Sequence, residues 1–248
     1  MEQVLTFTSR GRALQAGFSS PSPGRPCVVF SHGLESHKDG GKWLVLDRAL
    51  NEAGFACLRF TYSGCGEGAG KSDGAFEDTS LSGRIEDYRA ALDFVRTMDK
   101  DVDRLGVIGS SFGGMVALAA GDPRIRAMVV LATPCTLSPN IHGWLDSRKG
   151  EGFFLLPSGR QIKAAGLRDI RQFDILKSTS QIDCPLLIIH GAEDETVPVQ
   201  NARSIYEAAP EPKSLEIIEG GDHSLDGPGA LQRLVGLTVE WFTRYLER

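Results

Sequence analysis

One serine stands in a setting that can turn a hydroxyl into a nucleophile. Ser111 lies between Gly109 and Gly113, after the apolar residues 107–108 and before an alanine- and leucine-rich run at 115–120. This order predicts a buried strand, a tight turn and a helix. A serine hydroxyl needs a base to remove its proton, and it reaches a substrate best from a sharp backbone corner. Glycine on both sides makes room for that corner because it has no Cβ atom.

The predicted helix after Ser111 also indicates where negative charge would be stabilised. The first amides of a helix point out of its N-terminus, here toward the hydroxyl. We therefore expect the amide of Phe112 to donate to the oxyanion of a reacting carbonyl group. Glycine is abundant, with 29 in 248 residues, so the motif gains its meaning from the strand and helix around it. Ser110 lacks the symmetric glycines and is interpreted as structural.

A second donor is expected at the end of another strand. Residues 27–31 form a short apolar run typical of a buried parallel strand, and a His-Gly pair follows them. The backbone can turn at Gly33 and leave one amide exposed at the tip of the strand. That amide belongs to Leu34, and we expect Gly33 to border the substrate. We interpret His32 as a structural residue that fixes this loop.

An activated serine requires an imidazole, and the imidazole requires a carboxylate that fixes its tautomer. In an open parallel sheet, these groups come from loops at the carboxyl ends of strands. Of the five histidines, His223 lies in a glycine-containing loop after the last predicted strand, so it is the predicted base. His190 also ends a strand, but it faces a tight turn and is interpreted as packed.

Three acids compete for the role of the carboxylate in the loop after the strand predicted at residues 186–190. Asp194 lies three residues past Gly191, and its short side chain suits a rigid partner for an imidazole. We therefore predict that Asp194 orients the base. Glu193 and Glu195 are the alternatives at this point.

The elements around these motifs alternate between strand and helix. The chain opens with two alternating segments, at residues 4–7 and 13–18, that predict a hairpin. Apolar runs predict further strands at 27–31, 56–60, 103–109, 127–132, 186–190 and 215–218. Helical spacing predicts helices at 43–53, 81–98, 199–208 and 228–246. The predicted fold is α/β, with a mostly parallel central sheet, an N-terminal antiparallel hairpin and helices on both faces.

Residues 135–183 interrupt this alternation. Loops with proline and glycine join short amphipathic stretches there, and Trp144, Phe153 and Phe154 add apolar surface. Such a long irregular stretch inside a regular α/β chain predicts an inserted lid over a pocket. We expect these three aromatic residues to bind substrate, within one domain that spans residues 1–248. A merely irregular connection is the alternative.

The composition is that of an ordinary globular domain. A net charge of −5 gives no basic patch, which argues against nucleic acid or an anionic membrane as partner. The N-terminus has no apolar core of signal-peptide length, and no run approaches transmembrane length. Five scattered cysteines predict buried thiols and a reducing, cytoplasmic compartment. No Cys/His group has metal spacing, so neither metal nor cofactor is expected.

A glycine-rich segment at residues 64–72 ends in Gly-Lys-Ser and so approaches the phosphate-binding P-loop pattern. Cys65 stands where that pattern requires glycine, and Glu67 places a negative charge inside the loop. Nucleotide binding is therefore not predicted.

The order Ser111, Asp194, His223, with a His-Gly pair after the first parallel strand, resembles the α/β-hydrolase superfamily. The loop at 191–198 reads Gly-x-x-Asp-x-x-Val-Pro, and residues 220–223 read Gly-x-x-His. Both are similar to the acid and histidine loops of that superfamily. The resemblance covers nearly the whole chain.

Within the superfamily, the size and position of the lid resemble those of bacterial feruloyl and cinnamoyl esterases and of monoacylglycerol-lipase-like or dienelactone-hydrolase-like enzymes. The resemblance implies a serine carboxylesterase that hydrolyses short-chain acyl, aryl or hydroxycinnamoyl esters through an acyl-enzyme. The same triad serves thioesterases, peptidases and carbon–carbon hydrolases, and the same scaffold can act as a small-molecule receptor, so these stay alternatives. The expected partner is a small ester, and the hairpin and lid offer surfaces for a homodimer.

Overall fold

The central sheet of the protein has eight strands in the order β1-β2-β4-β3-β5-β6-β9-β10. It is seen in a computed structural model that describes residues 2–98, 102, 104–147 and 152–247. Three strands make the antiparallel part: β1 (Gln3–Ser9), β2 (Arg12–Ser19) and β4 (Ala56–Phe60). From β4 onward every pairing is parallel, through β3 (Cys27–Ser31), β5 (Leu105–Ser110), β6 (Ile125–Leu131), β9 (Leu186–Gly191) and β10 (Lys213–Ile218).

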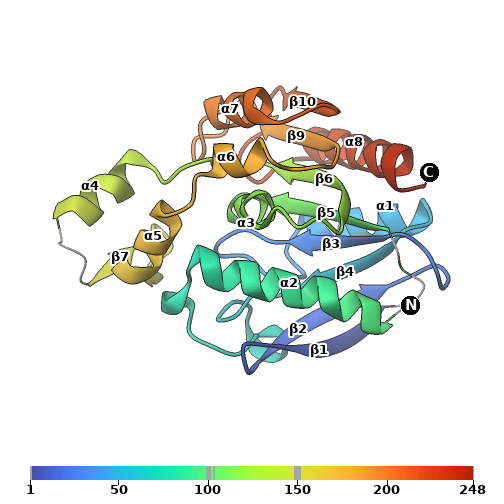
Figure 1. Ribbon diagram of the computed structural model, residues 1–248, viewed down its shortest axis with the longest axis horizontal. Helices are drawn as coiled ribbons and strands as arrows, with labels where there is room; N and C mark the ends of the chain where they lie inside the picture. Colours follow the sequence, from blue (N-terminus) through green and yellow to red (C-terminus); the bar gives the residue numbers. More distant parts are fainter. Residues whose placement is uncertain (1, 99–101, 103, 148–151, 248) are drawn as a thin grey trace.

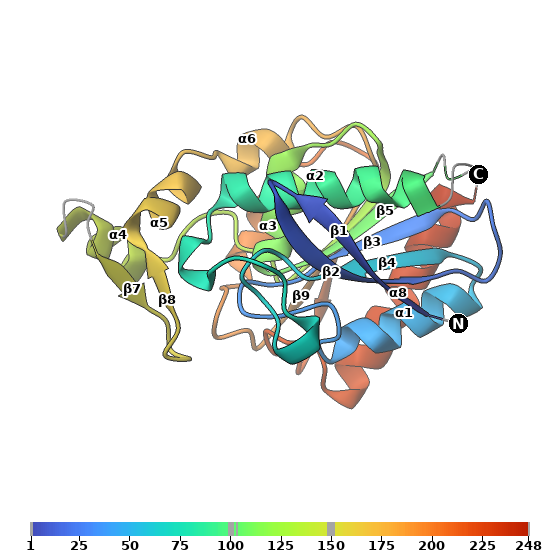
Figure 2. The ribbon, with the colours of Figure 1, turned by 90° about the horizontal axis from the view of Figure 1, so that it is seen from below.

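Helices cover both faces of this sheet (Figures 1 and 2). One face carries α1 (Lys42–Glu52) and α8 (Pro228–Leu246). The other carries α2 (Leu81–Met98), α3 (Phe112–Ala120) and α7 (Gln200–Ala208). Two short 3-10 helices, Gly68–Gly70 and Phe76–Asp78, lie between β4 and α2. The fold is therefore α/β with a mostly parallel sheet and an N-terminal hairpin, as predicted. In the ranges described, no helix is both long and apolar enough to cross a membrane.

Strand β5 delivers the candidate nucleophile from the middle of the sheet. It lies between β3 and β6, and all six of its residues are buried. Helices on both faces explain why its sequence is apolar or glycine at every position before the last, Ser110. Because parallel strands run in one direction, the carboxyl ends of β3, β5, β9 and β10 lie along the same edge. The loops after these four ends can therefore meet.

The predicted interruption at residues 135–183 corresponds to an insertion between β6 and β9, of which residues 148–151 lie outside the described residues. We call residues 135–183 the insertion. Its α4, α5 and two-stranded sheet extend to one side of the main sheet (Figures 1 and 2). Its elements are α4 (Pro139–Ser147), β7 (Phe153–Leu155), β8 (Gln161–Lys163), α5 (Ala164–Arg171) and α6 (Ile175–Thr179). That the insertion acts as a lid stays a prediction.

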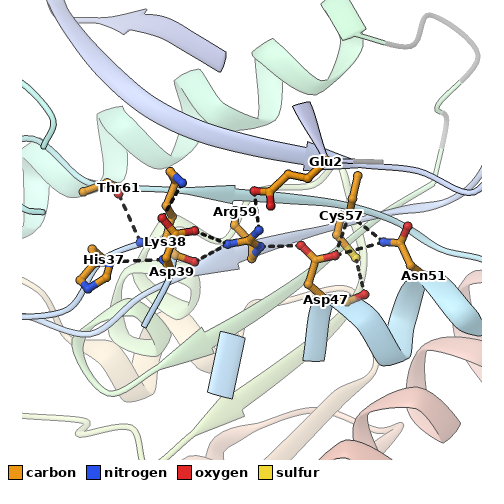
Figure 3. A network of polar contacts seen from close by, with 10 residues as sticks. Glu2, His37, Lys38, Asp39, Asp47, Asn51, Cys57, Arg59 and Thr61 are labelled. Atoms are coloured by element: carbon orange, nitrogen blue, oxygen red, sulfur yellow. Dashed lines mark hydrogen bonds and ion pairs between the residues drawn. The ribbon is translucent and has the colours of Figure 1, made fainter. Parts of the chain in front are cut away.

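Arg59 of β4 is a buried cation that joins three segments (Figure 3). Its Nε donates to Asp47 of α1 at 2.5 Å, and its Nη2 donates to Glu2 at 2.5 Å. Its Nη1 donates to Asp39 at 2.6 Å and to the carbonyl of Lys38 at 2.8 Å. Burial alone would lower the pKa of Arg59, but the bond and charge of Asp47 raise it. This cluster holds the loop at residues 38–39 against the sheet.

The hydroxyl of Ser72 is used inside the fold. It donates to the carbonyl of Thr61 at 2.6 Å and accepts from the amide of Gln15 at 3.0 Å. The side chain is buried. The hydroxyl that a P-loop would offer to a bound phosphate and its metal ion is therefore already engaged.

All five cysteines carry free thiols, as the sequence predicted. Four are buried and Cys135 is half-buried. Burial raises the pKa of Cys57 well above its usual value and that of Cys184 to about 12. Both side chains are therefore neutral thiols near pH 7, with little nucleophilic character.

Candidate active site

Ser111 occupies a strained corner between β5 and α3. Its backbone has φ 53° and ψ −122°, a region that residues with a side chain rarely adopt. The surrounding chain holds it there: the Ser111 amide donates to the carbonyl of Leu131 at 2.7 Å, and the amide of Gly114 donates to the Ser111 carbonyl at 3.0 Å. Such strain occurs where the structure needs one particular geometry, and here it lifts the hydroxyl out of the turn.

The glycines on either side of Ser111 are required by close backbone contacts. A Cβ atom at Gly113 would collide with the carbonyl oxygen of Ser31 and lie 2.5 Å from that of His32. A Cβ atom at Gly109 would lie 2.7 Å from the Cα of Gly114. The close backbone approach that the sequence predicted at these two glycines is therefore present in the structure.

The side chains of Ser111, His223 and Asp194 form one hydrogen-bonded series. His223 Nε2 lies 3.1 Å from Ser111 Oγ, and His223 Nδ1 lies 2.8 Å from Asp194 Oδ2. An ionised carboxylate only accepts, so Nδ1 carries the proton and Nε2 is free to accept from the serine hydroxyl. This tautomer is the one that a general base for Ser111 needs.

The Asp194 carboxylate is buried and surrounded by donors. Its Oδ1 accepts from the amides of Thr196 at 2.9 Å and Val197 at 2.8 Å. Burial by itself raises the pKa of Asp194, but hydrogen bonds from His190, His223 and Val197 outweigh it and hold that pKa well below its usual range. The carboxylate is therefore ionised wherever the imidazole is neutral. The two alternatives in this loop, Glu193 and Glu195, are exposed.

His190 is packed, as expected, but it also contacts Asp194, which the sequence did not predict. Its Nε2 lies 2.8 Å from the carbonyl of Val197 and 3.2 Å from Asp194 Oδ2. A carbonyl only accepts, so Nε2 carries the proton and donates to both oxygens. The spacing of four residues between His190 and Asp194, across a turn, was the only signal for this contact.

The loop of Asp194 and the loop of His223 touch through their backbones. A Cβ atom at Gly191 would collide with the carbonyl of Gly221 and lie 2.5 Å from that of Asp222. The carboxylate of Asp222 accepts from the amides of Ser224 at 3.1 Å and Leu225 at 2.9 Å. Asp222 therefore shapes the turn that carries the histidine, and it is exposed.

Two amides beside Ser111 have no acceptor among the residues that the structure describes. Gly33 lies against the serine, because a Cβ atom there would be 3.5 Å from Ser111 Cβ. Across the described residues, neither the Leu34 amide nor the Phe112 amide donates to a backbone or side-chain acceptor. Amides without a partner are rare in folded proteins, and two of them at a nucleophile match what an oxyanion requires.

His32 holds the first of these amides in place. The ring is buried, with Nε2 accepting from the Tyr62 amide at 3.0 Å and Nδ1 donating to the Gly33 carbonyl at 2.7 Å. Burial, together with the charge of Arg84, lowers the pKa of His32 well below its usual value, so the ring is neutral. The role is structural, as the sequence predicted.

Residues 28–231 match the alpha/beta hydrolase family. The chain belongs to this family. The match begins in β3 and ends in α8, so it includes Ser111, Asp194 and His223.

Three proteins illustrate how this alpha/beta hydrolase relates to others. Palmitoyl-protein thioesterase ABHD10, mitochondrial, of Pongo abelii is 25% identical over 208 residues, which cover 78% of this chain. The chain spans 65% of the length of that relative. The ferulic acid complex of Est1E from Butyrivibrio proteoclasticus superposes with a TM-score of 0.84 at 23% identity, covering 98% of this chain and 100% of Est1E. The esterase domain of a Rhodothermus marinus protein superposes with a TM-score of 0.75 at 27% identity, covering 99% of each chain.

In this alpha/beta hydrolase a cavity of about 550 Å³ lies beside Ser111 and His223. Gly33 and Leu34 form part of its wall, and that Gly33 borders the substrate stays a prediction. The residues of the insertion that reach the wall are Leu156 and Pro157. A volume of this size suits a small organic substrate.

The structure differs from the expectation for the three aromatic residues of the insertion, because none of them is on this wall. Trp144 and Phe154 pack edge to face with ring centroids 5.3 Å apart. Phe153 points outward from β7 and is 51% exposed, since successive side chains of a strand alternate between faces. Trp144 and Phe154 therefore pack against each other within the insertion, and the turn after β7 reaches the cavity instead.

Lys42 lies on the wall of the cavity, although no pattern in the sequence indicated it as a site residue. It is the first residue of α1 and is half-buried, and its Nζ donates to the carbonyl of Ser224 at 2.6 Å. Burial lowers the pKa of Lys42 to about 8, against the opposing charges of Asp226, Asp222 and Asp194. The contact joins the start of α1 to the turn that carries the histidine.

Proposed function

We propose that this protein is a serine hydrolase that cleaves small carboxylic esters through an acyl-enzyme. The observation that carries the proposal is the series of hydrogen bonds from Asp194 through His223 to Ser111. It lies beside two amides without acceptors and opens on a cavity. Nucleophile, base, orienting carboxylate and oxyanion donors are the parts that acyl transfer requires.

The proposed reaction proceeds in two halves. His223 removes the proton of Ser111, and the serine oxygen bonds to the ester carbonyl carbon, whose oxygen becomes an anion held by the amides of Leu34 and Phe112. The carbonyl re-forms, the ester bond breaks, and His223 gives its proton to the departing alcohol. Water then attacks the acyl-enzyme with the same help, releasing the acid and restoring the serine. Asp194 stabilises the imidazolium that forms in each half.

The substrate class that we propose is a carboxylic ester with a short-chain acyl, aryl or hydroxycinnamoyl group. The cavity has room for such a group, and part of its wall is apolar through Leu34, Trp43, Leu156 and Pro157. The similarity to the Rhodothermus marinus esterase domain supports ester hydrolysis. A panel of acetyl, butyryl, octanoyl and feruloyl esters would rank these groups by kcat/KM.

The test of the nucleophile is Ser111→Ala with a p-nitrophenyl ester. We expect hydrolysis to fall to the background rate, while Ser110→Ala retains most of the activity. A fluorophosphonate probe should add its mass to Ser111 in the wild type and leave the Ser111→Ala protein unlabelled. Turnover by Ser111→Ala would rule out this nucleophile, and absence of labelling in the wild type would favour a non-catalytic receptor.

Thioester hydrolysis is the second candidate, because the similar ABHD10 of Pongo abelii is named a palmitoyl-protein thioesterase. The same triad can attack either carbonyl, so the acyl group and the leaving group must be varied separately. Octanoyl and palmitoyl groups should each be offered as an oxygen ester and as a thioester. A higher kcat/KM for the thioester at every chain length would make the protein a thioesterase.

The cellular compartment and the cofactor requirement that we propose are those expected from the sequence. We propose an enzyme of the cytoplasm that acts on a small molecule without a cofactor, and free thiols are compatible with a reducing compartment. The homodimer stays a prediction, which light scattering behind a size-exclusion column would test.

A further inference from the structure

Arg84 is a buried arginine that forms no ion pair with a carboxylate of the described residues. It lies in the first turns of α2, on the same face as the core residues Leu81, Ile85 and Tyr88. Its Nε is buried and makes no hydrogen bond in the described part of the chain. Burying a guanidinium without an opposite charge is costly, so the contacts that it does make call for an explanation.

Those contacts join the two segments that carry the amides without acceptors. Arg84 Nη1 donates to the carbonyl of Gly33 at 3.2 Å, and Nη2 donates to the carbonyl of Leu34 at 2.7 Å. Nη2 also lies 3.2 Å from Cys65 Sγ. The guanidinium carbon is 5.1 Å from the ring centroid of Phe112 and 4.7 Å from that of Tyr62. One side chain therefore touches both Leu34 and Phe112 without occupying either amide.

The bond to the Gly33 carbonyl has a geometric consequence. That carbonyl and the Leu34 amide belong to one planar trans peptide, in which C=O and N–H point in opposite directions. Arg84 and His32 both hold the carbonyl oxygen, so the Leu34 N–H must point away from them. A Cβ atom at Gly33 would lie 3.5 Å from Ser111 Cβ, so this peptide is next to the candidate nucleophile.

We propose that Arg84 is a positioning residue for the oxyanion hole, an inference that rests on the proposed function. Its Nη1 fixes the orientation of the peptide between Gly33 and Leu34, and its Nη2 holds the next peptide through the Leu34 carbonyl, so that the Leu34 amide is aimed before substrate arrives. Its hydrogen-bonding partners are neutral, so its positive charge is not cancelled by them and also favours negative charge at the carbonyl oxygen. Donors that are aimed in advance stabilise a transition state more than ones that must reorganise.

The sequence held one signal for this role. Arg84 interrupts a stripe at 81, 85, 88 and 92 that is otherwise apolar or aromatic, and a charged residue in such a stripe is either paired or functional. The spacing did not indicate which segment Arg84 would contact, because the loop at residues 33–34 is fifty positions away in the sequence.

The experiment compares Arg84→Met and Arg84→Lys with a matched control, Arg89→Met. Arg89 lies on the same helix and also donates to a backbone carbonyl, that of Ala120 at 3.1 Å, but it does not contact the loop at residues 33–34. We expect Arg84→Met to lower kcat for a p-nitrophenyl ester by about 10–100-fold with KM within about twofold, less than the loss of a whole donor. Arg84→Lys should lie between Arg84→Met and the wild type, and Arg89→Met should keep the wild-type kcat.

A second readout separates positioning from a merely structural role. A trifluoromethyl ketone forms a tetrahedral adduct with an oxyanion, so its inhibition constant should rise by the same factor as kcat/KM falls. A structural defect would lower the fraction of active protein, which titration with a fluorophosphonate measures, and leave the inhibition constant of the remaining sites unchanged. If Arg84→Met does not fold, the same comparison is made with Arg84→Lys.

The inference and the proposed function fail in different ways. A folded Arg84→Met, or Arg84→Lys in its place, with wild-type kcat and wild-type affinity for the ketone would overturn the role of Arg84 alone. A wild-type protein that neither hydrolyses esters or thioesters nor reacts with the fluorophosphonate would overturn the proposed function itself.

Discussion

The edge of the sheet that carries Ser111 and the insertion beside it are built in different ways. At the edge, backbone meets backbone with no space for a side chain. Gly113 touches the carbonyl of Ser31, and Gly191 touches that of Gly221. The first contact sets the turn of Ser111 against the end of β3, and the second sets the loop of Asp194 against the loop of His223.

Part of the insertion is held by polar side chains at its surface, although α5 also packs closely on the rest of the chain, since a Cβ atom at Gly166 would collide with the carbonyl of Thr79. The carboxylate of Asp169 accepts from the hydroxyl of Ser82 at 2.6 Å and from its amide at 2.8 Å, and Lys163 pairs with Asp78. Leu155 is 61% exposed. Contacts between long surface side chains can be exchanged one at a time without moving a strand, whereas backbone contacts cannot.

This contrast indicates where the protein can vary. Catalytic geometry needs sub-ångström placement, which close backbone packing on rigid elements supplies. Cavity walls that choose a substrate can come from a segment outside this edge, such as the turn at residues 156–157. Paired substitutions in the main fold and in the insertion would test this contrast.

The largest effect is expected from two carboxylates that each accept several hydrogen bonds. Asp194→Asn should lower kcat by about 10⁴-fold because the imidazole is held in the wrong tautomer. Asp169→Asn, in the insertion, should change kcat by no more than about twofold, since its hydrogen bonds hold only α5 to α2. Steady-state kinetics with one ester measure both. If Glu193→Gln or Glu195→Gln proved inactive instead, the acid would be misassigned.

A pair of glycines comes next. Gly113→Ala should reduce the free energy of unfolding by more than about 4 kcal/mol, because its Cβ meets two carbonyl oxygens that cannot move. Gly143→Ala lies inside α4 with open space around it, and it should raise that free energy by about 0.5–1 kcal/mol. Urea denaturation followed by circular dichroism compares the two. Equal, small effects would contradict the contrast between the two regions.

A pair of arginines should differ less strongly. Arg59→Met removes a buried cation from the carboxylates of Glu2, Asp39 and Asp47 and should cost about 3–5 kcal/mol. Arg171→Met removes a surface ion pair with Asp146 and should cost about 0–1 kcal/mol. Thermal and urea unfolding at one ionic strength measure both. A small cost for Arg59→Met would show that its cluster adds little to stability.

The smallest expected effect is on the pH dependence of the free energy of unfolding. The pKa of Asp194 is lower in the folded chain than in the unfolded chain, so ionised Asp194 favours folding above the ordinary pKa of an aspartate, about 4. That contribution is lost as pH falls through the lower pKa of the folded state. Urea unfolding from pH 7 to pH 3 should therefore show a steeper loss in the wild type than in Asp194→Asn. Parallel curves would mean that the folded carboxylate is not specially stabilised.

The sequence alone was enough to predict the strands and helices of the main sheet, and to select Ser111, Asp194 and His223, which the structure brings within hydrogen-bond distance. The helices predicted at 81–98 and 228–246 match α2 and α8, because their apolar spacing is a local property. The corner at Ser111 was recognisable because its glycines, strand and helix are contiguous. Asp194 and His223 were found by one topological rule, that loops at the carboxyl ends of parallel strands share an edge.

The neighbours of these three residues could be identified from the tertiary structure but not from the sequence. The contact of Arg84 with residues 33–34 and that of Lys42 with Ser224 each join a side chain to backbone atoms of a distant segment. The cavity wall likewise depends on how the insertion turns. Spacing along a chain encodes which face of an element is buried, but the partner across that face is chosen only when distant segments pack together.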